Sequence, residues 1–330
     1  MKIAVLLGGT SMERDVSVAS GTQVISALRS AGHEVIAVEY SRGVLVSAEE
    51  RELLVSGINA EPPRNMGDAE DWLPVLAKKV QMAEVDLVFL ALHGGWGEDG
   101  TIQAVFEKTG LPYTGSNKLG SRLAMDKNTA KKIFCANKVP TPKWLMAPVS
   151  ISVVDDQLGF PVIVKPNSQG STVGLTLVNN PVDLESAITV SSAFDDEVMV
   201  ERYISGRELT VGILDGETLA VGEIIPAEGD IFDYAAKYQI GAAQEIFPAI
   251  IDQDTEKKIR KMALLAHQAL ELGSYSRVDF RMDSAGELWV LEVNTLPGLS
   301  SGSLLPKSAE AKGIGFVKLC ERICHGAIVK

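Results

Sequence analysis

Residues 275–303 read YSRVDFRMDSAGELWVLEVNTLPGLSSGS, and this stretch decides the fold of the second half of the chain. Two runs, 275–282 and 287–293, are rich in aromatic and β-branched residues. They flank a cluster of turn-forming residues at 283–286 (DSAG). Strand-like runs on either side of a short turn predict a β-hairpin.

The side chains of this hairpin are expected to divide between its two faces. A tight turn sets Asp279 opposite Val290, which makes Asp279 and Glu292 diagonal neighbours about 7–8 Å apart. Because side chains alternate along a strand, one face carries Arg277, Asp279, Glu292 and Asn294. Two acids and an amide are hard oxygen ligands, which suit Mg²⁺ better than zinc. The alternative is a solvated face that carries ordinary charges.

A loop of small residues follows the hairpin at 295–303 (TLPGLSSGS). A strand that leads through a turn into Ser and Gly brings backbone N–H groups to an anion. The loop therefore favours a phosphate-linked site over a plain surface hairpin.

The composition is that of a globular protein with two or three domains. The 330 residues are 46% hydrophobic and 22% charged, which allows a large core. The net charge of −12 argues against general nucleic-acid binding. The start, MKIAVLLGGT, lacks a long apolar segment with a cleavage site, and no apolar run spans a bilayer, so no membrane association is expected. Three cysteines without framework spacing indicate a reducing, cytoplasmic location.

The first forty residues predict the opening of a doubly wound domain. A buried-type strand over Lys2–Leu7 leads through glycines into a helix over 17–31 and a second strand over 33–40. GxGxxG and GxxxxGK[ST] are both absent, which argues against a dinucleotide site and a P-loop. Glu13 lies where such sheets bind ligands, or it only favours the helix N-terminus.

Three further segments carry candidate functional residues. His93 ends a strand over 85–92, where it either contacts substrate or only braces the loop. Lys165 precedes the loop PNSQGSTVG (166–174), which closes over polyphosphate or is a plain hairpin loop. Residues 230–241 lack clear periodicity and predict a long loop that acts as a lid.

Taken together, these blocks resemble the D-alanine–D-alanine ligases of the ATP-grasp superfamily. The matching blocks occur in the family's order over nearly the whole chain: GGTSMERDVS (8–17), HGGWGEDGTIQ (93–103), LPYTGS (111–116), MDK (125–127), VIVKPNSQGSTVG (162–174), VERYISGRELTVG (200–212), FDYAAKY (232–238), RVDF (277–280) and EVNTLPGLSSGSLLP (292–306). The resemblance implies an α/β fold, α+β in part, with a three-domain ATP-grasp architecture. An N-terminal doubly wound parallel-sheet domain (1–114) would precede the central (115–204) and C-terminal (205–330) ATP-grasp subdomains, with ATP between the last two.

The resemblance also implies a reaction. ATP phosphorylates the carboxylate of one D-alanine, the amine of a second attacks the acyl phosphate, and phosphate leaves from a tetrahedral intermediate. The product, D-alanyl-D-alanine, is a precursor of peptidoglycan. The family uses two Mg²⁺ ions, or Mn²⁺ in their place, and the residues that match the metal ligands are Asp279, Glu292 and Asn294. A homodimer is expected on the same ground, with the first domain as the contact.

Several residues match nucleotide-binding positions of the family. Lys127 and Lys165 match the lysines that hold the α- and β-phosphates, and Lys237 matches the lid lysine that reaches the γ-phosphate. Glu201 and Glu208 match the acids near the adenine and the ribose. The backbone that completes the adenine contact matches Arg202, Tyr203 and Ile204.

Other residues match positions on the substrate side. Arg277 and the N–H of Gly298 match the pair that stabilises the oxyanion, and Ser303 with the N–H of Leu304 matches the site of the second carboxylate. Glu13 matches the residue that holds the first ammonium group, and His93 matches a substrate-side histidine. A hydrogen-bonded triad that ties the lid to the substrate matches Glu13, Ser171 and Tyr238.

Two departures and one match affect the second substrate. Gly302 stands where many relatives carry a larger residue, and residues 167–169 (NSQ) are more neutral than the Arg- and Glu-bearing versions of the family. Tyr238 favours D-alanine, because relatives that make D-alanyl-D-lactate often have Phe there. The alternatives are an ATP-grasp ligase for another acceptor, such as D-lactate, D-serine or a different amino acid, and a non-catalytic ATP-binding module.

Overall fold

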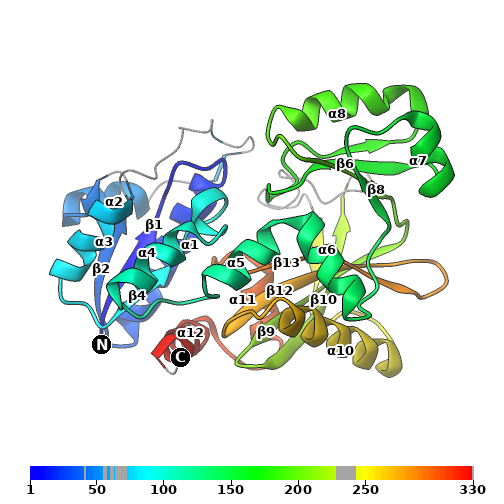
Figure 1. Cartoon of the computed structure of the whole chain (residues 1–330). Helices are drawn as coiled ribbons and strands as arrows, with labels where there is room; N and C mark the ends of the chain where they lie inside the picture. Colours follow the sequence, from blue (N-terminus) through cyan, green and yellow to red (C-terminus); the bar gives the residue numbers. More distant parts are fainter. Residues whose placement is uncertain (41, 55–57, 60–62, 64–72, 228–242, 329–330) are drawn as a thin grey trace.

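The chain folds around three β-sheets, which follow one another along the sequence (Figure 1). The computed structural model describes residues 1–40, 42–54, 58–59, 63, 73–227 and 243–328. The predicted lid at 230–241, with Lys237 and Tyr238, lies outside the described residues. Within the described part, no helix combines the length and the apolar character that crossing a membrane requires.

The N-terminal sheet has the strand order β3-β2-β1-β4, and its strands are β1 (Lys2–Leu7), β2 (Glu34–Glu39), β3 (Gly43–Val44) and β4 (Leu87–Leu90). The strands β2 and β4 run parallel to β1, and the short edge strand β3 is antiparallel. Its helices are α1 (Arg14–Ser30), α2 (Ser47–Leu54), α3 (Leu73–Met82) and α4 (Thr101–Thr109), with a 3₁₀ turn, η2, at Gly95–Gly97. Parallel strands joined through helices confirm the predicted doubly wound pattern.

The C-terminal sheet is antiparallel in the order β11-β10-β9-β12-β13, and its strands are β9 (Arg207–Leu214), β10 (Glu217–Pro226), β11 (Ala243–Ile246), β12 (Tyr275–Met282) and β13 (Leu288–Asn294). The helices α10 (Gln253–Ala269) and α11 (Leu304–Glu310) pack on it. The last helix, α12 (Phe316–Ile328), returns to the N-terminal sheet and lies against α1. Its buried residues Leu319 and Ile323 belong to the N-terminal core.

The central sheet is small and antiparallel in the order β5-β8-β6-β7, and its strands are β5 (Trp144–Met146), β6 (Val162–Pro166), β7 (Thr176–Val178) and β8 (Val198–Arg202). Its helices are α7 (Ile151–Gln157) and α8 (Leu184–Ser192), with a 3₁₀ turn, η3, at Pro181–Asp183. The core between them is built from short apolar residues such as Val162, Val164 and Val200.

Two helices that precede the central sheet pack instead with the C-terminal one. These helices are α5 (Lys118–Met125) and α6 (Lys127–Ala136). Their N-cap residues are Asn117 and Asp126, whose side chains accept hydrogen bonds from helical N–H groups. Phe134 of α6 lies in one core cluster with Val278 and Phe280 of β12. The domain boundaries 1–114, 115–204 and 205–330 stay a prediction, with one sheet inside each segment.

The hairpin β12–β13 has a different register from the one that a tight turn predicts. Asp279 lies opposite Glu292, not opposite Val290. One cause is the turn, where the Asp283 N–H donates to the Glu287 carbonyl at 3.0 Å, so the loop is one residue longer than expected. The second cause is a β-bulge, because Phe280 pairs with Val290 and leaves one residue of β13 unmatched.

The two shifts cancel in their effect on the faces of the hairpin. A slip of one residue moves every side chain of a strand to the other face of the sheet. The bulge at Leu291 adds a second residue, and this restores the alternation beyond it. Arg277 pairs with Asn294 and Asp279 with Glu292. The predicted common face is therefore confirmed, although the predicted register is wrong.

We expect the connection between β8 and β9 to be intolerant of a side chain at Gly206. This residue has φ +136°, and an added Cβ would penetrate the carbonyl oxygen of Met282, which is backbone and cannot rotate away. Gly206→Ala should lower the free energy of unfolding by about 2–4 kcal/mol. Denaturant titration would measure the loss.

The matched control is Gly286→Ala. Gly286 has φ +80° but nothing within 4 Å of an added Cβ, so only the conformational cost of about 1–2 kcal/mol applies. A Gly206→Ala loss no larger than that of the control would contradict the steric argument.

Candidate active site

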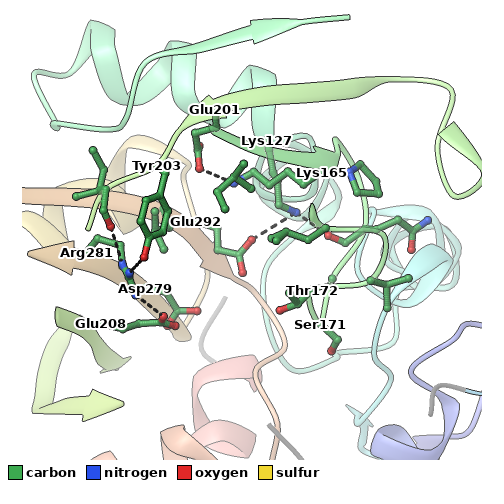
Figure 2. A pocket seen from close by; sticks show the side chains of 18 of the residues that line it. Lys127, Lys165, Ser171, Thr172, Glu201, Tyr203, Glu208, Asp279, Arg281 and Glu292 are labelled. Carbon is green, nitrogen blue, oxygen red and sulfur yellow. Dashed lines mark hydrogen bonds and ion pairs between the residues drawn. The ribbon is translucent and has the colours of Figure 1, made fainter. Parts of the chain in front are cut away.

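A cleft between the central and C-terminal sheets gathers most of the predicted nucleotide and metal residues (Figure 2). It is partly open to solvent and is lined by polar and apolar side chains from both sheets. The predicted residues among those that line it are Lys127, Lys165, Ser171, Glu201, Arg202, Tyr203, Ile204, Glu208, Arg277, Asp279, Glu292 and Leu304. Asn294 lines a smaller adjoining hollow, which shares Lys127 and Glu292 with the cleft.

The carboxylate of Asp279 accepts hydrogen bonds from side chains of three strands. The Arg277 guanidinium donates to both of its oxygens, from Nε at 2.9 Å and from Nη2 at 2.8 Å. The Thr210 hydroxyl donates to Oδ1 at 2.7 Å, and the Asn294 amide donates to Oδ2 at 2.9 Å. Asp279 is only 8% exposed, so this set of donors fixes the carboxylate on the strand face.

Glu292 lies across the hairpin from Asp279 and faces a lysine. Its Oε2 is 3.4 Å from the Nζ of Lys127, which also donates to the Gln169 carbonyl at 2.7 Å. Lys127 comes from the first turn of α6 and Gln169 from the loop after β6. The lysine therefore joins the hairpin face to the loop that is predicted to cover phosphate.

The donor chemistry of this face fits a hard cation. It offers two carboxylates, Asp279 and Glu292, and the amide oxygen of Asn294, which are the ligand types that Mg²⁺ prefers. No cluster of three or more His, Cys, Asp or Glu residues is placed for a metal within the described residues. A cation held here would need further oxygens from a ligand, which is the usual arrangement at a phosphate-bound Mg²⁺.

The far end of the cleft has a second set of buried charges. Lys165 donates to Oε1 of Glu201 at 2.8 Å, and Lys131 forms an ion pair with Oε2 at 2.6 Å. Burial raises the pKa of Glu201, but the charges of the two lysines outweigh it and hold the pKa below its usual value. Glu201 therefore stays ionised inside the wall of the cleft.

Arg281 organises the segment that connects β8 to β9. Its guanidinium donates to the Ile204 carbonyl at 3.0 Å, the Glu208 carboxylate at 3.1 Å and the Tyr203 hydroxyl at 3.0 Å. Figure 2 shows Arg281 reaching both Tyr203 and Glu208. The Arg202 N–H donates to the Lys143 carbonyl at 2.9 Å, and its side chain is exposed.

Glu13 enters the site from the N-terminal domain, where it precedes α1. The Ser171 hydroxyl donates to its Oε1. A Cβ on Gly94 or Gly170 would lie 2.7 or 2.6 Å from Oε2, so only glycine leaves room for this carboxylate at either place. Ser171 and Thr172 have φ of +51° and +63°. This strained loop conformation costs about 1–3 kcal/mol per residue, and the contact with Glu13 offsets part of that cost.

In the small-residue loop after β13, Ser300 and Ser303 are hydrogen-bonded to each other. The Ser303 hydroxyl accepts from the Ser300 N–H at 3.1 Å and lies 2.8 Å from the Ser300 hydroxyl. A Cβ on Gly298 would meet Ser303 Oγ at 2.8 Å, whereas one on Gly302 would find nothing closer than 3.9 Å. The loop therefore requires glycine at 298 by packing, and the space at 302 would accept the larger residue of many relatives.

Comparisons with known proteins agree over the full length of the chain. The family model described as the D-ala D-ala ligase N-terminus matches residues 2–116, and the one described as the D-ala D-ala ligase C-terminus matches residues 139–325. The chain belongs to the D-alanine–D-alanine ligase family.

Individual members of the ligase family match closely. The D-alanine–D-alanine ligase of Geobacter sulfurreducens is 38% identical, covering 100% of this chain and 95% of the relative. That of a Synechococcus species is 39% identical, covering 99% and 94%. The crystal structure of the Bacillus anthracis ligase complexed with ATP superposes with a TM-score of 0.80 at 32% identity, covering 100% and 98%. The VanG D-Ala:D-Ser ligase of Enterococcus faecalis gives 0.77 at 30%, covering 98% of both chains.

The ligase family resemblance did not single out Arg281, Lys131 or Asn167. Asn167 is fully buried, donates to Asp126 at 2.8 Å and to Glu197 at 3.0 Å, and accepts from the Asn128 N–H at 2.8 Å. It thereby fastens the loop after β6 to the start of α6. Spacing gave a usable signal for two of the three, because Arg281 lies two residues after Asp279 on the same strand face and Lys131 lies one helical turn after Lys127.

His93 is held by protein groups on both sides. Its Nε2 lies 3.0 Å from the Ser20 hydroxyl, which in turn accepts from the Leu299 N–H at 3.1 Å, and the ring hydrogen-bonds the backbone of Leu296. Burial lowers the pKa of His93 to about 4, although the bond to Leu296 raises it. These contacts are those of a residue that braces α1 against the small-residue loop; direct contact with substrate stays a prediction.

A pH-dependent loss of stability is expected from His93. Because its folded pKa of about 4 lies below the ordinary 6.5, the unfolded chain binds more protons between these values and stability falls as pH falls through that window. The native chain should lose about 1–2 kcal/mol more than His93→Gln between about pH 7 and pH 5. Denaturant unfolding at the two pH values measures the difference.

Comparing the two proteins removes the contribution of the other buried histidine. Burial lowers the pKa of His267 to about 4 as well, but His267 is present in both. Equal losses in the two proteins would contradict the assignment of His93 as a buried neutral brace.

Proposed function

We propose that this chain joins two D-alanines into D-alanyl-D-alanine, with ATP as the phosphoryl donor and an acyl phosphate as the intermediate, for synthesis of the peptidoglycan precursor. One observation carries the proposal. In a chain that belongs to the ligase family, a single strand face at the cleft holds Arg277, Asp279, Glu292 and Asn294. The small-residue loop predicted to bind an anion follows the same strand.

The nucleotide would lie with its base and ribose between the β8–β9 segment and β13. Glu201 and Glu208, each paired with a cation, would accept hydrogen bonds from the base and the ribose. Lys127 and Lys165 would neutralise phosphate oxygens while they stay near their carboxylate partners. Transfer of a phosphoryl group needs this positioning and charge neutralisation more than it needs covalent help.

Asp279, Glu292 and Asn294 would hold two Mg²⁺ ions, as the family resemblance implies. The ions would supply neutralisation of the phosphate charges against which an anionic carboxylate must approach. The protein would contribute a fixed ligand, because hydrogen bonds from Arg277 and Thr210 hold the Asp279 carboxylate in place. The donor set is one of hard oxygens, which supports Mg²⁺ and Mn²⁺ over softer metals.

The two amino acids would occupy the side of the cleft that the N-terminal domain closes. Glu13 would hold the first ammonium group, with Ser171 fixing the carboxylate from the central domain. Arg277 and the N–H of Gly298 would stabilise the developing oxyanion, an effect of about 3–4 kcal/mol for each such donor. Ser303 and the N–H of Leu304 would bind the second carboxylate, and the lid residues Lys237 and Tyr238 would complete the site.

The assembly state and location complete the proposal. A homodimer in contact through the first domain is what the family resemblance implies. The three cysteines without framework spacing favour a reducing, cytoplasmic location. This chain is 30% identical in sequence to the VanG D-Ala:D-Ser ligase. D-Serine is therefore the acceptor that most needs a direct comparison with D-alanine.

The test is phosphate release with ATP and Mg²⁺, together with the mass of the product. The arms are D-alanine, L-alanine, D-serine, and D-alanine with D-lactate. Release with D-alanine alone and a dipeptide mass are expected. Turnover only with another acceptor would overturn the choice of second substrate, and no turnover with any acceptor in a chain that binds ATP would overturn the ligase function.

Glu292→Gln should nearly abolish turnover. The substitution keeps the shape of the side chain but removes the charge that balances a divalent cation and Lys127. We expect kcat to fall by about 100-fold or more, with the fold and its stability retained. Steady-state kinetics over a range of Mg²⁺ concentrations would measure the effect.

Glu287→Gln is the control for the loss of charge alone. Glu287 begins the same arm of the hairpin but is exposed and is not among the residues that line the cleft. It should leave kcat unchanged. A near-native kcat for Glu292→Gln would refute the placement of a metal-bound phosphate at this face.

A further inference from the structure

Lys131 is a fully buried lysine that does not line the cleft. Its exposed fraction is 0%, and it lies on α6 one turn after Lys127. Its Nζ is 2.6 Å from Oε2 of Glu201, donates to the Thr141 hydroxyl at 2.6 Å, and lies 5.1 Å from the centre of the Trp144 ring. It therefore contacts the hidden side of Glu201, while Lys165 contacts the side that faces the cleft.

The burial of Lys131 costs free energy that an apolar side chain at this place would not cost. Removing an ion pair from water often costs more than the pair returns, and well-packed apolar residues of similar volume are as good or better for stability. Burial lowers the pKa of Lys131 to about 8, against the opposing influence of Glu201. A fold that needed only a packed core at this place would do better with an apolar side chain such as methionine.

Lys131 also connects the two sheets that form the cleft. The Thr141 hydroxyl, which accepts from Lys131, donates in turn to the Val290 carbonyl at 2.8 Å. The Val290 N–H donates to the Pro140 carbonyl at 2.9 Å. Val290 adjoins the bulge residue Leu291, whose side chain lines the cleft. A continuous buried path thus runs from β8 of the central sheet to β13 of the C-terminal sheet.

We propose that Lys131 is a positioning residue that sets the base selectivity of the nucleotide site, because it holds the Glu201 carboxylate ionised and aimed at the exocyclic amino group of adenine. The inference rests on the proposed function, in which Glu201 faces the base. An ionised carboxylate can only accept hydrogen bonds. It therefore favours the 6-amino group of adenine and repels the 6-oxo group of hypoxanthine.

The loss of Lys131 would change the chemistry of Glu201. Within the described residues, Lys165 would then be the remaining cation paired with Glu201. Because burial disfavours the charged form of a carboxyl group, Glu201 would bind a proton more readily. A protonated carboxyl group can donate to an oxo group. Discrimination between the two bases would then weaken, and not merely the affinity for all nucleotides.

The experiment compares Lys131→Met with Lys132→Met. Lys132 is the next residue of the same helix and is exposed, so its variant controls for the loss of one lysine from α6. Calorimetry would measure binding of the β,γ-imido analogues of ATP and ITP to each full-length protein in Mg²⁺. The preference for the adenine nucleotide should fall by about fivefold or more in Lys131→Met and stay unchanged in the control.

Steady-state kinetics add a second readout. Because Lys131 is buried behind Glu201 and does not line the cleft, KM for ATP should rise by about tenfold while kcat stays within about twofold. Equal weakening of both nucleotides, or a fall in kcat without a change in KM, would overturn the proposal and leave Lys131 a residue of the core.

Thr141→Val provides an independent variant if Lys131→Met does not fold. It keeps the lysine but removes the hydroxyl that links it to β13, so the preference for adenine should fall in the same direction by a smaller factor. An unchanged preference would overturn the proposal. The binding measurement needs neither D-alanine nor turnover, so a native chain that discriminates the two nucleotides but forms no dipeptide would separate a failure of the ligase function from a failure of this inference.

Discussion

The pairing of each carboxylate in the cleft with a cation is the constraint on which the rest of the site depends. The chain has a net charge of −12, yet it directs the carboxylates of Glu201, Asp279 and Glu292 into one partly buried space. Unpaired, these like charges would repel one another. Each has a cation within 3.4 Å, and these cations come from α6, β6 and β12. The packing of α6, β6 and β12 around the cleft therefore also pairs its carboxylates with cations.

This pairing ties α6 to both sheets, because its two lysines reach one carboxylate on each of them. Lys127 at its start reaches Glu292, and Lys131 one turn later reaches Glu201. Phe134, a further turn on, enters the core beneath β12. One face of a single helix thus carries two cations and then an apolar anchor, because residues three and four apart share a helical face. Moving the helix would remove a cation from two carboxylates together.

The sequence was sufficient for the faces of the hairpin but not for its register. Alternation along β12 and β13 placed Arg277 and Asp279 with Asn294, because period-two patterning survives a shift of two residues. Neither the longer turn nor the bulge at Leu291 has a local signature, since both depend on how β13 pairs with β12 in three dimensions.

The buried partners of the site were missed for a different reason. Lys131 and Asn167 act on groups distant in the sequence, and a lysine or an asparagine is by default assigned to the surface. Their roles become visible only in the folded structure, where both side chains have an exposed fraction of 0% and lie beside charged residues. Motifs identify residues that touch ligands, whereas residues that hold those residues in place carry no motif of their own. A polar residue that lies one helical turn from a site residue, on the same face, is the closest thing to a signal that the sequence offers, and in α6 that spacing alone would have pointed to Lys131.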